Sequence, residues 1–208
     1  MRYIIMCGGD YGFPRHLTQI HGEPLIQRTI RQLKEHGISP EISTNAESLS
    51  GFAPILKHPN GYTVNGEQVT GAWVDAFYPT DDPTCYIFGD VVFSDEAIKT
   101  IVERETDSID FFASCPPFSH LFIKEWAEPF AFKVQDQKRF RAAIDFVKAN
   151  LETGIFRRHP IAWELWQVIH GRDVREIDYG SYISINDYTC DIDHPEDAPR
   201  IEAMMCKY

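Results

Sequence analysis

The chain has 208 residues, 43% of them hydrophobic and 25% charged, which is typical of a globular protein that buries a core. Its formal net charge of −11 argues against long nucleic acids and anionic membranes as partners, because phosphate contacts need lysine and arginine. A small anion can still bind where backbone N–H groups or a divalent metal ion supply positive charge.

Cysteine usage and apolar runs indicate a cytoplasmic protein. The five cysteines include no C-x-x-C pair, and their odd count favours reduced thiols over a disulfide framework or a structural zinc site. The apolar run at residues 3–6 is too short for a signal peptide. No stretch approaches the roughly 20 apolar residues of a membrane span.

The first part of the chain has the pattern that opens an α/β sheet. Residues 3–7 are a short apolar run that ends at glycines, which predicts a buried parallel strand. After a loop at residues 8–21, Pro24 begins a helix with apolar residues at helical spacing, and Gly37 ends it. Residues 41–44 predict the second strand.

The middle of the chain repeats this alternation. An Asn-Gly turn predicts a hairpin within residues 60–69, and a helix is expected over residues 71–77. Residues 85–88 predict a buried strand that ends in Gly-Asp. Ser94 is placed to cap the following helix, and residues 109–115 predict another buried strand.

After Pro116 the chain becomes rich in aromatic residues and less regular. We expect a strand at 132–134, helices at 138–151, 162–169 and 195–206, and an extended segment at 175–185. The sequence therefore predicts one domain over residues 1–208. Residues 1–115 would form its first half. Residues 116–208 would form a second lobe that returns its last strand to the sheet.

Three segments carry the chemistry. The glycine-rich loop at residues 7–15 lets the backbone approach a ligand closely, although it is neither a Rossmann G-x-G-x-x-G nor a P-loop. Asp90 follows a buried strand, at the edge where ligands bind in open α/β sheets. Asp191 and Asp193 precede a proline that begins the last helix, so Asp193 could also serve as a helix cap.

Residues 14–26 resemble the signature Pro-Lys-x-Leu-x-x-Ile-x-Gly-Lys-Pro-Leu of sugar-phosphate and alcohol-phosphate nucleotidyltransferases. Residues 20–26 are most similar to bacterial cytidylyltransferases of the phosphocholine type. Asp90 follows this signature in the chain. Residues 191–197 come next and resemble the Asp-x-Asp-x-Pro-Glu-Asp motif near the C-terminal end of many of these enzymes, so the three motifs occur in the order typical of the family. The chain departs from the pattern at Arg15 and Glu23, which replace lysines of the signature. Its glycine-rich loop is also shorter than is usual in the family.

The resemblance implies a Rossmann-like three-layer α/β/α nucleotidyltransferase fold with a mainly parallel sheet. It implies a Mg²⁺-dependent transfer of a nucleoside monophosphate from a nucleoside triphosphate, with CTP favoured. The acceptor would be a phosphorylated small molecule, such as a sugar phosphate or phosphocholine, and pyrophosphate would be released. Asp90 and Asp193 would hold the Mg²⁺ ion, with Asp191 as the alternative to Asp193.

The same resemblance makes residues 1–115 the nucleotide-binding half and residues 116–208 the acceptor lobe, and it assigns the remaining candidate residues. Arg15 and the backbone N–H groups of Gly8 and Gly9 would hold the triphosphate. Gly71 would give the base room, and Lys133 would be a cation on the acceptor side. Glu23 is expected to be a solvated carboxylate at the start of its helix.

Two further groups of side chains have alternative interpretations. Residues 157–159 form a small basic cluster that could bind an acceptor phosphate or lie as surface cations at a helix end. Four aromatic residues could form a box for a quaternary ammonium group or belong to the core: Trp126, Trp163, Trp166 and Tyr182.

Two rival functions stay open. A degenerate domain of the same fold could bind nucleotide or a partner protein without turnover, because Glu23 and the short glycine loop depart from the signature. A metal-dependent glycosyltransferase would share the fold, but it usually carries Asp-x-Asp in mid-chain, and Asp90 has no second aspartate two residues away.

Overall fold

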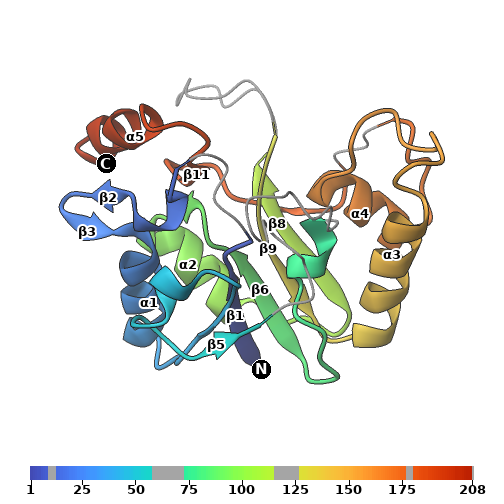
Figure 1. Cartoon of the computed structure of the whole chain (residues 1–208), viewed down its shortest axis with the longest axis horizontal. Helices are drawn as coiled ribbons and strands as arrows, with labels where there is room; N and C mark the ends of the chain where they lie inside the picture. The colour runs from blue at the N-terminus through green and yellow to red at the C-terminus, as the bar shows by residue number, and fades with distance from the viewer. Residues whose placement is uncertain (9–12, 58–72, 115–126, 177–179, 208) are drawn as a thin grey trace.

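A mixed sheet of seven strands forms the centre of the chain in the computed structural model (Figure 1). The structure describes residues 1–8, 13–57, 73–114, 127–176 and 180–207. Across the sheet the strands follow the order β10 (Ile183–Ser184), β8 (Ile109–Ser114), β9 (Glu128–Val134), β6 (Thr84–Phe88), β1 (Arg2–Met6), β4 (Glu41–Ser43) and β5 (Ile55–Leu56).

The sheet is mainly parallel, as the sequence predicted. Strand β1 pairs in parallel with β4 and β6, and β4 pairs in parallel with β5. Strand β9 is antiparallel to both β6 and β8, while β10 is parallel to β8. The carboxyl ends of β1, β4, β5 and β6 therefore meet at one edge of the sheet, and β9 begins at that edge.

Helices cover both faces of the sheet and form two cores. On one face lie α1 (Leu25–Glu35), α2 (Asp95–Glu103) and α5 (Asp197–Met205), and on the other lie α3 (Gln137–Ala149) and α4 (Ala162–Ile169) (Figure 1). In β1, Tyr3 and Ile5 pack into the first core, and Ile4 and Met6 into the second. This two-sided burial is the reason that the strand is a continuous apolar run.

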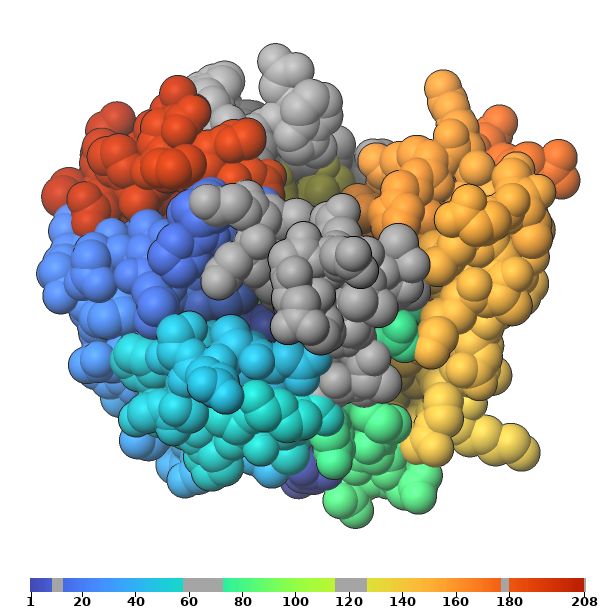
Figure 2. All heavy atoms as spheres, viewed as in Figure 1, coloured from blue at the N-terminus to red at the C-terminus, as the bar shows by residue number. Residues whose placement is uncertain are grey.

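Small elements complete the fold. Two two-stranded sheets pair β2 (Gln19–Ile20) with β3 (Glu23–Pro24) and β7 (Val91–Val92) with β11 (Cys190–Asp191). Within the described ranges, the 3₁₀ helices are η1 (Arg15–Leu17), η2 (Glu47–Leu49) and η3 (Trp73–Ala76). Figure 2 shows the C-terminal helix α5, in red, seated beside the blue N-terminal part of the chain, where the His21 N–H donates to Glu202.

Local signals at the helix ends are confirmed. Helix α1 begins directly after Pro24, and Gly37 follows its end with a φ of +75°, a conformation that favours glycine. The Ser94 hydroxyl accepts a hydrogen bond from the Ala97 N–H at 2.9 Å and so caps α2. The helix predicted at 162–169 has these same bounds in the structure.

Several predicted elements differ. Strand β9 starts at Glu128 rather than 132 and lies between β6 and β8, so the two predicted halves share one sheet. In the segment 175–185, the described residues contain a strand only at β10. The helix predicted over 71–77 is the shorter η3, and α5 begins at Asp197 rather than Pro195.

Some expectations fall on residues that the structure does not describe. The hairpin within 60–69 lies there, as do Cys115 and Trp126. In the part of the chain that is described, no helix is both long enough and apolar enough to cross a bilayer.

Candidate active site

The close approach of two neighbouring strands sets the position of Asp90. At the end of β6 the Gly89 N–H donates to the Met6 carbonyl at 2.9 Å. A Cβ atom at Gly89 would lie 2.6 Å from that oxygen and 2.6 Å from the Cys7 sulfur. Glycine is therefore required here, and it holds Asp90 beside the end of β1, at the carboxyl edge of the sheet.

A small sheet brings the second acidic segment to Asp90. Strand β7, directly after Asp90, pairs antiparallel with β11. The Ile192 N–H then donates to the Asp90 carbonyl at 2.8 Å, which places Asp193 next to Asp90. Backbone hydrogen bonds therefore bring together two aspartates that are far apart in the sequence.

Asp197, rather than Asp193, satisfies the backbone before the last helix. The Asp197 carboxylate accepts hydrogen bonds from the Asp193 N–H at 3.0 Å and from the His194 N–H at 2.8 Å. The alternative interpretation of Asp193 as a helix cap is therefore wrong, and its side chain is directed to other partners.

Arg15 joins the two carboxylates. It lies in η1, after the glycine-rich loop, and its Nη1 atom is 3.1 Å from Asp193 Oδ1 and 3.4 Å from Asp90 Oδ2. The structure thus brings together three of the residues that the sequence singled out, from three separate segments. Asp191 lies beside them.

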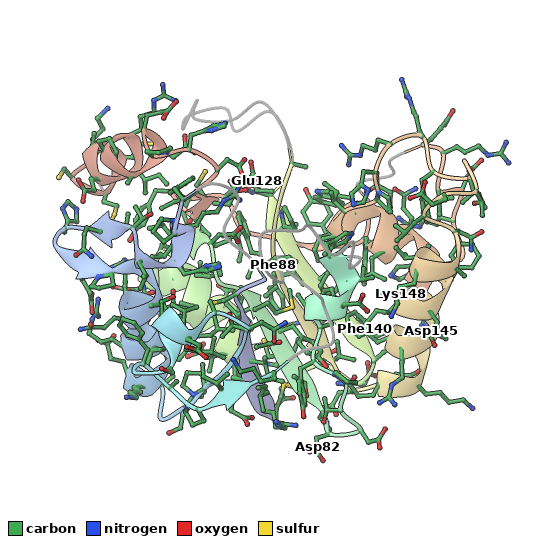
Figure 3. All side chains as sticks on the ribbon, in the orientation of Figure 1. Asp82, Phe88, Glu128, Phe140, Asp145 and Lys148 are labelled. Atoms are coloured by element: carbon green, nitrogen blue, oxygen red, sulfur yellow. The ribbon has the colours of Figure 1, made fainter. Side chains whose placement is uncertain are left out.

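These residues line a cavity of about 430 Å³. Arg15, Asp90, Asp191 and Asp193 contribute to its wall, and so do side chains that the sequence analysis missed or left open: Trp73, Phe88, Glu128, Arg158 and Trp163. Figure 3 labels Phe88, at the end of β6, and Glu128, at the start of the antiparallel β9, which lie toward the same edge of the sheet. The cavity therefore opens where ligands bind in α/β sheets.

Glu128 is the missed residue with the plainest electrostatic meaning. Glu128 is only 4% exposed. A buried carboxylate needs hydrogen-bond or charged partners to offset the cost of its desolvation. The signal in the sequence was a charged residue at the start of a mostly apolar strand, directly before Pro129. Trp73 adds a buried indole N–H that has no hydrogen-bond partner among the described residues.

Arg158 is held in place by a buried acid. Its Nε donates to Glu164 Oε1 at 2.6 Å, and Glu164 is 2% exposed. The other oxygen of Glu164 accepts the Ile161 N–H at 2.9 Å, at the start of α4. The cation is thereby fixed to a helix terminus. A glutamate at the third position of a helix is a known capping signal, so the contact of Glu164 with the Ile161 N–H was predictable from the sequence.

The predicted acceptor-side role of Lys133 does not fit the structure. Its Nζ donates to the carbonyls of Ile101, Val102 and Arg104 at the C-terminal end of α2. The residue is 5% exposed and is absent from the cavity wall, and burial lowers its pKa below the ordinary value. Lys133 satisfies the last carbonyls of a helix, where cations are favoured.

The other predicted residues divide between the site and the scaffold. Gly8 lies half-buried after Cys7, whereas Gly9 and Gly71 are outside the described residues. Glu23 pairs with Arg31 at 2.9 Å, away from the cavity wall. Its carboxylate is partly buried in this ion pair rather than freely solvated.

The aromatic box is not formed by the described members of the predicted set. Trp166 packs in the core against Phe111 and Phe132. Trp163 lines the cavity, with Tyr182 edge-on to it at 5.2 Å between ring centroids. Among the described members of this set, Trp163 lines the cavity, and the set does not form a cage.

The acidic pair can be tested for its fit to a metal ion. Within the described ranges no group of three or more His, Cys, Asp or Glu side chains is arranged as a metal site. Mg²⁺ does not require one, because it takes one or two carboxylates and completes its shell with phosphate oxygens and water. Asp90 and Asp193 already share a cation, the Arg15 guanidinium, so the donor set fits Mg²⁺ together with a bound nucleotide.

No protein-family model matches the sequence, and no curated protein matches it either. Solved structures do match. One is described as a glucose-1-phosphate thymidylyltransferase from Bacillus anthracis, in complex with a sucrose. It is 16% identical with a TM-score of 0.61, over 98% of this chain and 94% of that one. This chain has the nucleotidyltransferase fold.

Two other matches support this conclusion. A CMP:2-keto-3-deoxy-manno-octonic acid synthetase complexed with CTP has a TM-score of 0.55 and 10% identity, over 99% of this chain and 98% of that one. HddC from Yersinia pseudotuberculosis complexed with GMP-PN has a TM-score of 0.51 and 14% identity, over 99% of this chain and 100% of that one. At these identities the likeness establishes the fold, and the reaction rests on the side chains of the cavity.

Proposed function

We propose that this chain is a Mg²⁺-dependent nucleotidyltransferase that moves a nucleoside monophosphate from a nucleoside triphosphate to a phosphorylated small molecule. One observation carries the proposal. Asp90, Asp193 and Arg15 come from three distant segments and meet in one cavity, at the carboxyl edge of a nucleotidyltransferase fold. This edge is where nucleotides bind in open α/β sheets.

The reaction needs charge and position more than proton transfer. An oxygen of the acceptor phosphate attacks the α-phosphorus in line, the bond from that phosphorus to the bridging oxygen breaks, and pyrophosphate leaves. An ionised phosphate is already a nucleophile, so no general base is required. Bound Mg²⁺ supplies charge neutralisation. Asp90 and Asp193 would hold the ion, and Arg15 and the Gly8 N–H would bind triphosphate oxygens.

The nucleotide is the less specific part of the proposal. CTP is the first nucleotide to test, because residues 20–26 are most similar to phosphocholine-type cytidylyltransferases. The solved structures of this fold include complexes with CTP and with GMP-PN. We propose cytidylyl transfer, and we place it in the cytoplasm.

The remaining side chains of the cavity suit a phosphorylated acceptor. Arg158 donates through Nε to Glu164 and makes no other ion pair with the described residues, so its outer guanidinium nitrogens can bind a phosphate. Glu128 and Trp73 line the same cavity. A carboxylate suits acceptor hydroxyl or ammonium groups, and an indole N–H suits an acceptor oxygen. We propose that these groups bind the acceptor.

Substitution of Arg158 should therefore weaken acceptor binding selectively. We expect Arg158→Gln to raise the acceptor KM by about 10- to 100-fold, the loss of one charge-assisted hydrogen-bonded contact, and to leave nucleotide binding unchanged. Steady-state kinetics with the acceptor varied would measure this. Arg157→Gln is the matched control, because Arg157 is the exposed neighbour of Arg158 in the sequence and does not line the cavity.

A second variant separates binding from stability. Arg158→Gln leaves the buried Glu164 without its cation, which by itself can destabilise the fold. The double variant with Glu164→Gln removes that charge. If the double variant recovers both the melting temperature and the acceptor KM, Arg158 supports only the fold and its assignment to the acceptor is wrong.

A thermal-shift screen tests the proposed function at the level of binding. CTP, UTP, ATP, GTP and dTTP would each be added with and without Mg²⁺. We expect one nucleotide to raise the melting temperature in a Mg²⁺-dependent manner, because a ligand that binds only the folded state stabilises it by mass action. No shift with any nucleotide would contradict the proposal. A shift without turnover would support a binding domain of the same fold.

A further inference from the structure

Arg15 occupies the position between the two carboxylates that a metal ion would need. Its Nη1 contacts Asp193 Oδ1 at 3.1 Å and Asp90 Oδ2 at 3.4 Å, and its side chain is only 14% exposed. The guanidinium carbon also lies 5.9 Å from the centroid of the Phe13 ring. A cation of the protein itself therefore offsets one of the two negative charges of the acidic pair.

The backbone that carries the two carboxylates is fixed, whereas the cation is on a long side chain. Gly89 and the pairing of β7 with β11 determine the backbone at Asp90 and Asp193. Arg15 reaches them from η1 through several rotatable bonds. The guanidinium can thus leave the pair without any change in the sheet, while the pair itself stays assembled.

We propose that Arg15 is an internal counter-ion that competes with Mg²⁺ for Asp90 and Asp193, so that the ion binds tightly only together with a triphosphate. The inference rests on the proposed function. Asp90 and Asp193 would hold the metal ion, and these are the two carboxylates that Arg15 contacts, so the guanidinium and the ion would repel each other there. A triphosphate offers Arg15 a new anionic partner and removes the competition.

This exchange makes the binding of metal and nucleotide cooperative. Free metal binds only to the fraction of molecules in which Arg15 has left the carboxylates, so its apparent Kd is raised by the inverse of that fraction. Nucleotide increases the fraction. By linkage, metal improves nucleotide binding by the same factor. One side chain would then prevent loading of the site with metal alone.

The test measures Mn²⁺ binding by electron paramagnetic resonance in the absence of nucleotide, with no need for turnover. Arg15→Gln removes the charge and should tighten Mn²⁺ binding by about tenfold or more. Arg15→Lys keeps the charge and should resemble the wild type. Asp90→Asn in the Arg15→Gln background should abolish the gain.

The chain offers a closely matched control. Arg31 also bridges two carboxylates, Glu23 at 2.9 Å and Glu35 at 2.9 Å, on the outer side of α1. Arg31→Gln changes the net charge by the same single unit and should leave Mn²⁺ binding unchanged. An equal gain in Arg31→Gln would reduce the effect to overall charge and overturn the proposal.

The other outcomes are equally decisive. Unchanged or weaker Mn²⁺ binding in Arg15→Gln would overturn the counter-ion role. Melting curves would first show that the variant is folded, and Arg15→Met, of similar length and uncharged, provides a second test. Failure of the wild type to bind any nucleotide with Mg²⁺ would instead contradict the proposed function, because the Mn²⁺ comparison contains no nucleotide.

Discussion

Replacing Asp90 with asparagine should lower the rate of pyrophosphate release by about a hundredfold or more and leave the protein folded. Asparagine keeps the shape of the side chain but removes the negative charge that faces Arg15 and the proposed Mg²⁺ ion. Groups that neutralise charge developing in a transition state contribute on this scale. The measurement is Mg²⁺-dependent turnover, with a melting curve recorded for the same preparation.

Asp110→Asn is the control for this substitution. Asp110 is also a partly buried aspartate paired with an arginine, since Arg104 Nε lies 3.0 Å from its carboxylate. It lies on β8 outside the cavity wall, so its substitution should not change turnover. Equal activity in the Asp90→Asn variant and the wild type would remove the metal assignment.

Lys133→Met should lower the free energy of unfolding by about 3 kcal/mol. This is close to the contribution that hydrogen bonds to a charged group make to stability. The methionine has a similar length, but it leaves the carbonyls of Ile101, Val102 and Arg104 without their donor at the end of α2. For a chain of this size the melting temperature should fall by about 6–12 °C. Calorimetry or circular dichroism would measure the change.

Lys148→Met provides the comparison on the surface. Lys148 pairs with Asp75 at 2.5 Å, but its side chain is 44% exposed, so its loss should cost about 1 kcal/mol or less. At temperatures well below melting, Lys133→Met should keep its turnover. A stable Lys133→Met protein with lost turnover would restore the catalytic interpretation of Lys133.

Much of the fold was predictable because its signals are local. Two-sided burial makes β1 an apolar run, and helical spacing with Pro24 and Gly37 defines α1. Ser94 and the bounds of α4 follow from capping and periodicity in the same way. The identities of Asp90 and Asp193 as candidates came from strand ends and from a family resemblance.

The parts that were missed depend on residues distant in the chain. The length of β9 was underestimated because Glu128 and Pro129 interrupt its apolar pattern, although both neighbouring strands pair with it. The partners of Lys133 lie on α2, about 30 positions away, and no local pattern links them. The contact of Arg15 with the two aspartates depends on the β7–β11 pairing, which two-residue strands do not reveal in a sequence.

The most direct test of the central proposal is pyrophosphate release from CTP and Mg²⁺ in the presence of sugar phosphates and alcohol phosphates, with the wild type and the Asp90→Asn variant side by side. The account predicts release by the wild type with at least one acceptor. Release should be matched by a nucleotidylated product, and it should be lost when Mg²⁺ is chelated or Asp90 is replaced. Release that is independent of both Mg²⁺ and Asp90 would contradict the account, as would the absence of both release and nucleotide binding.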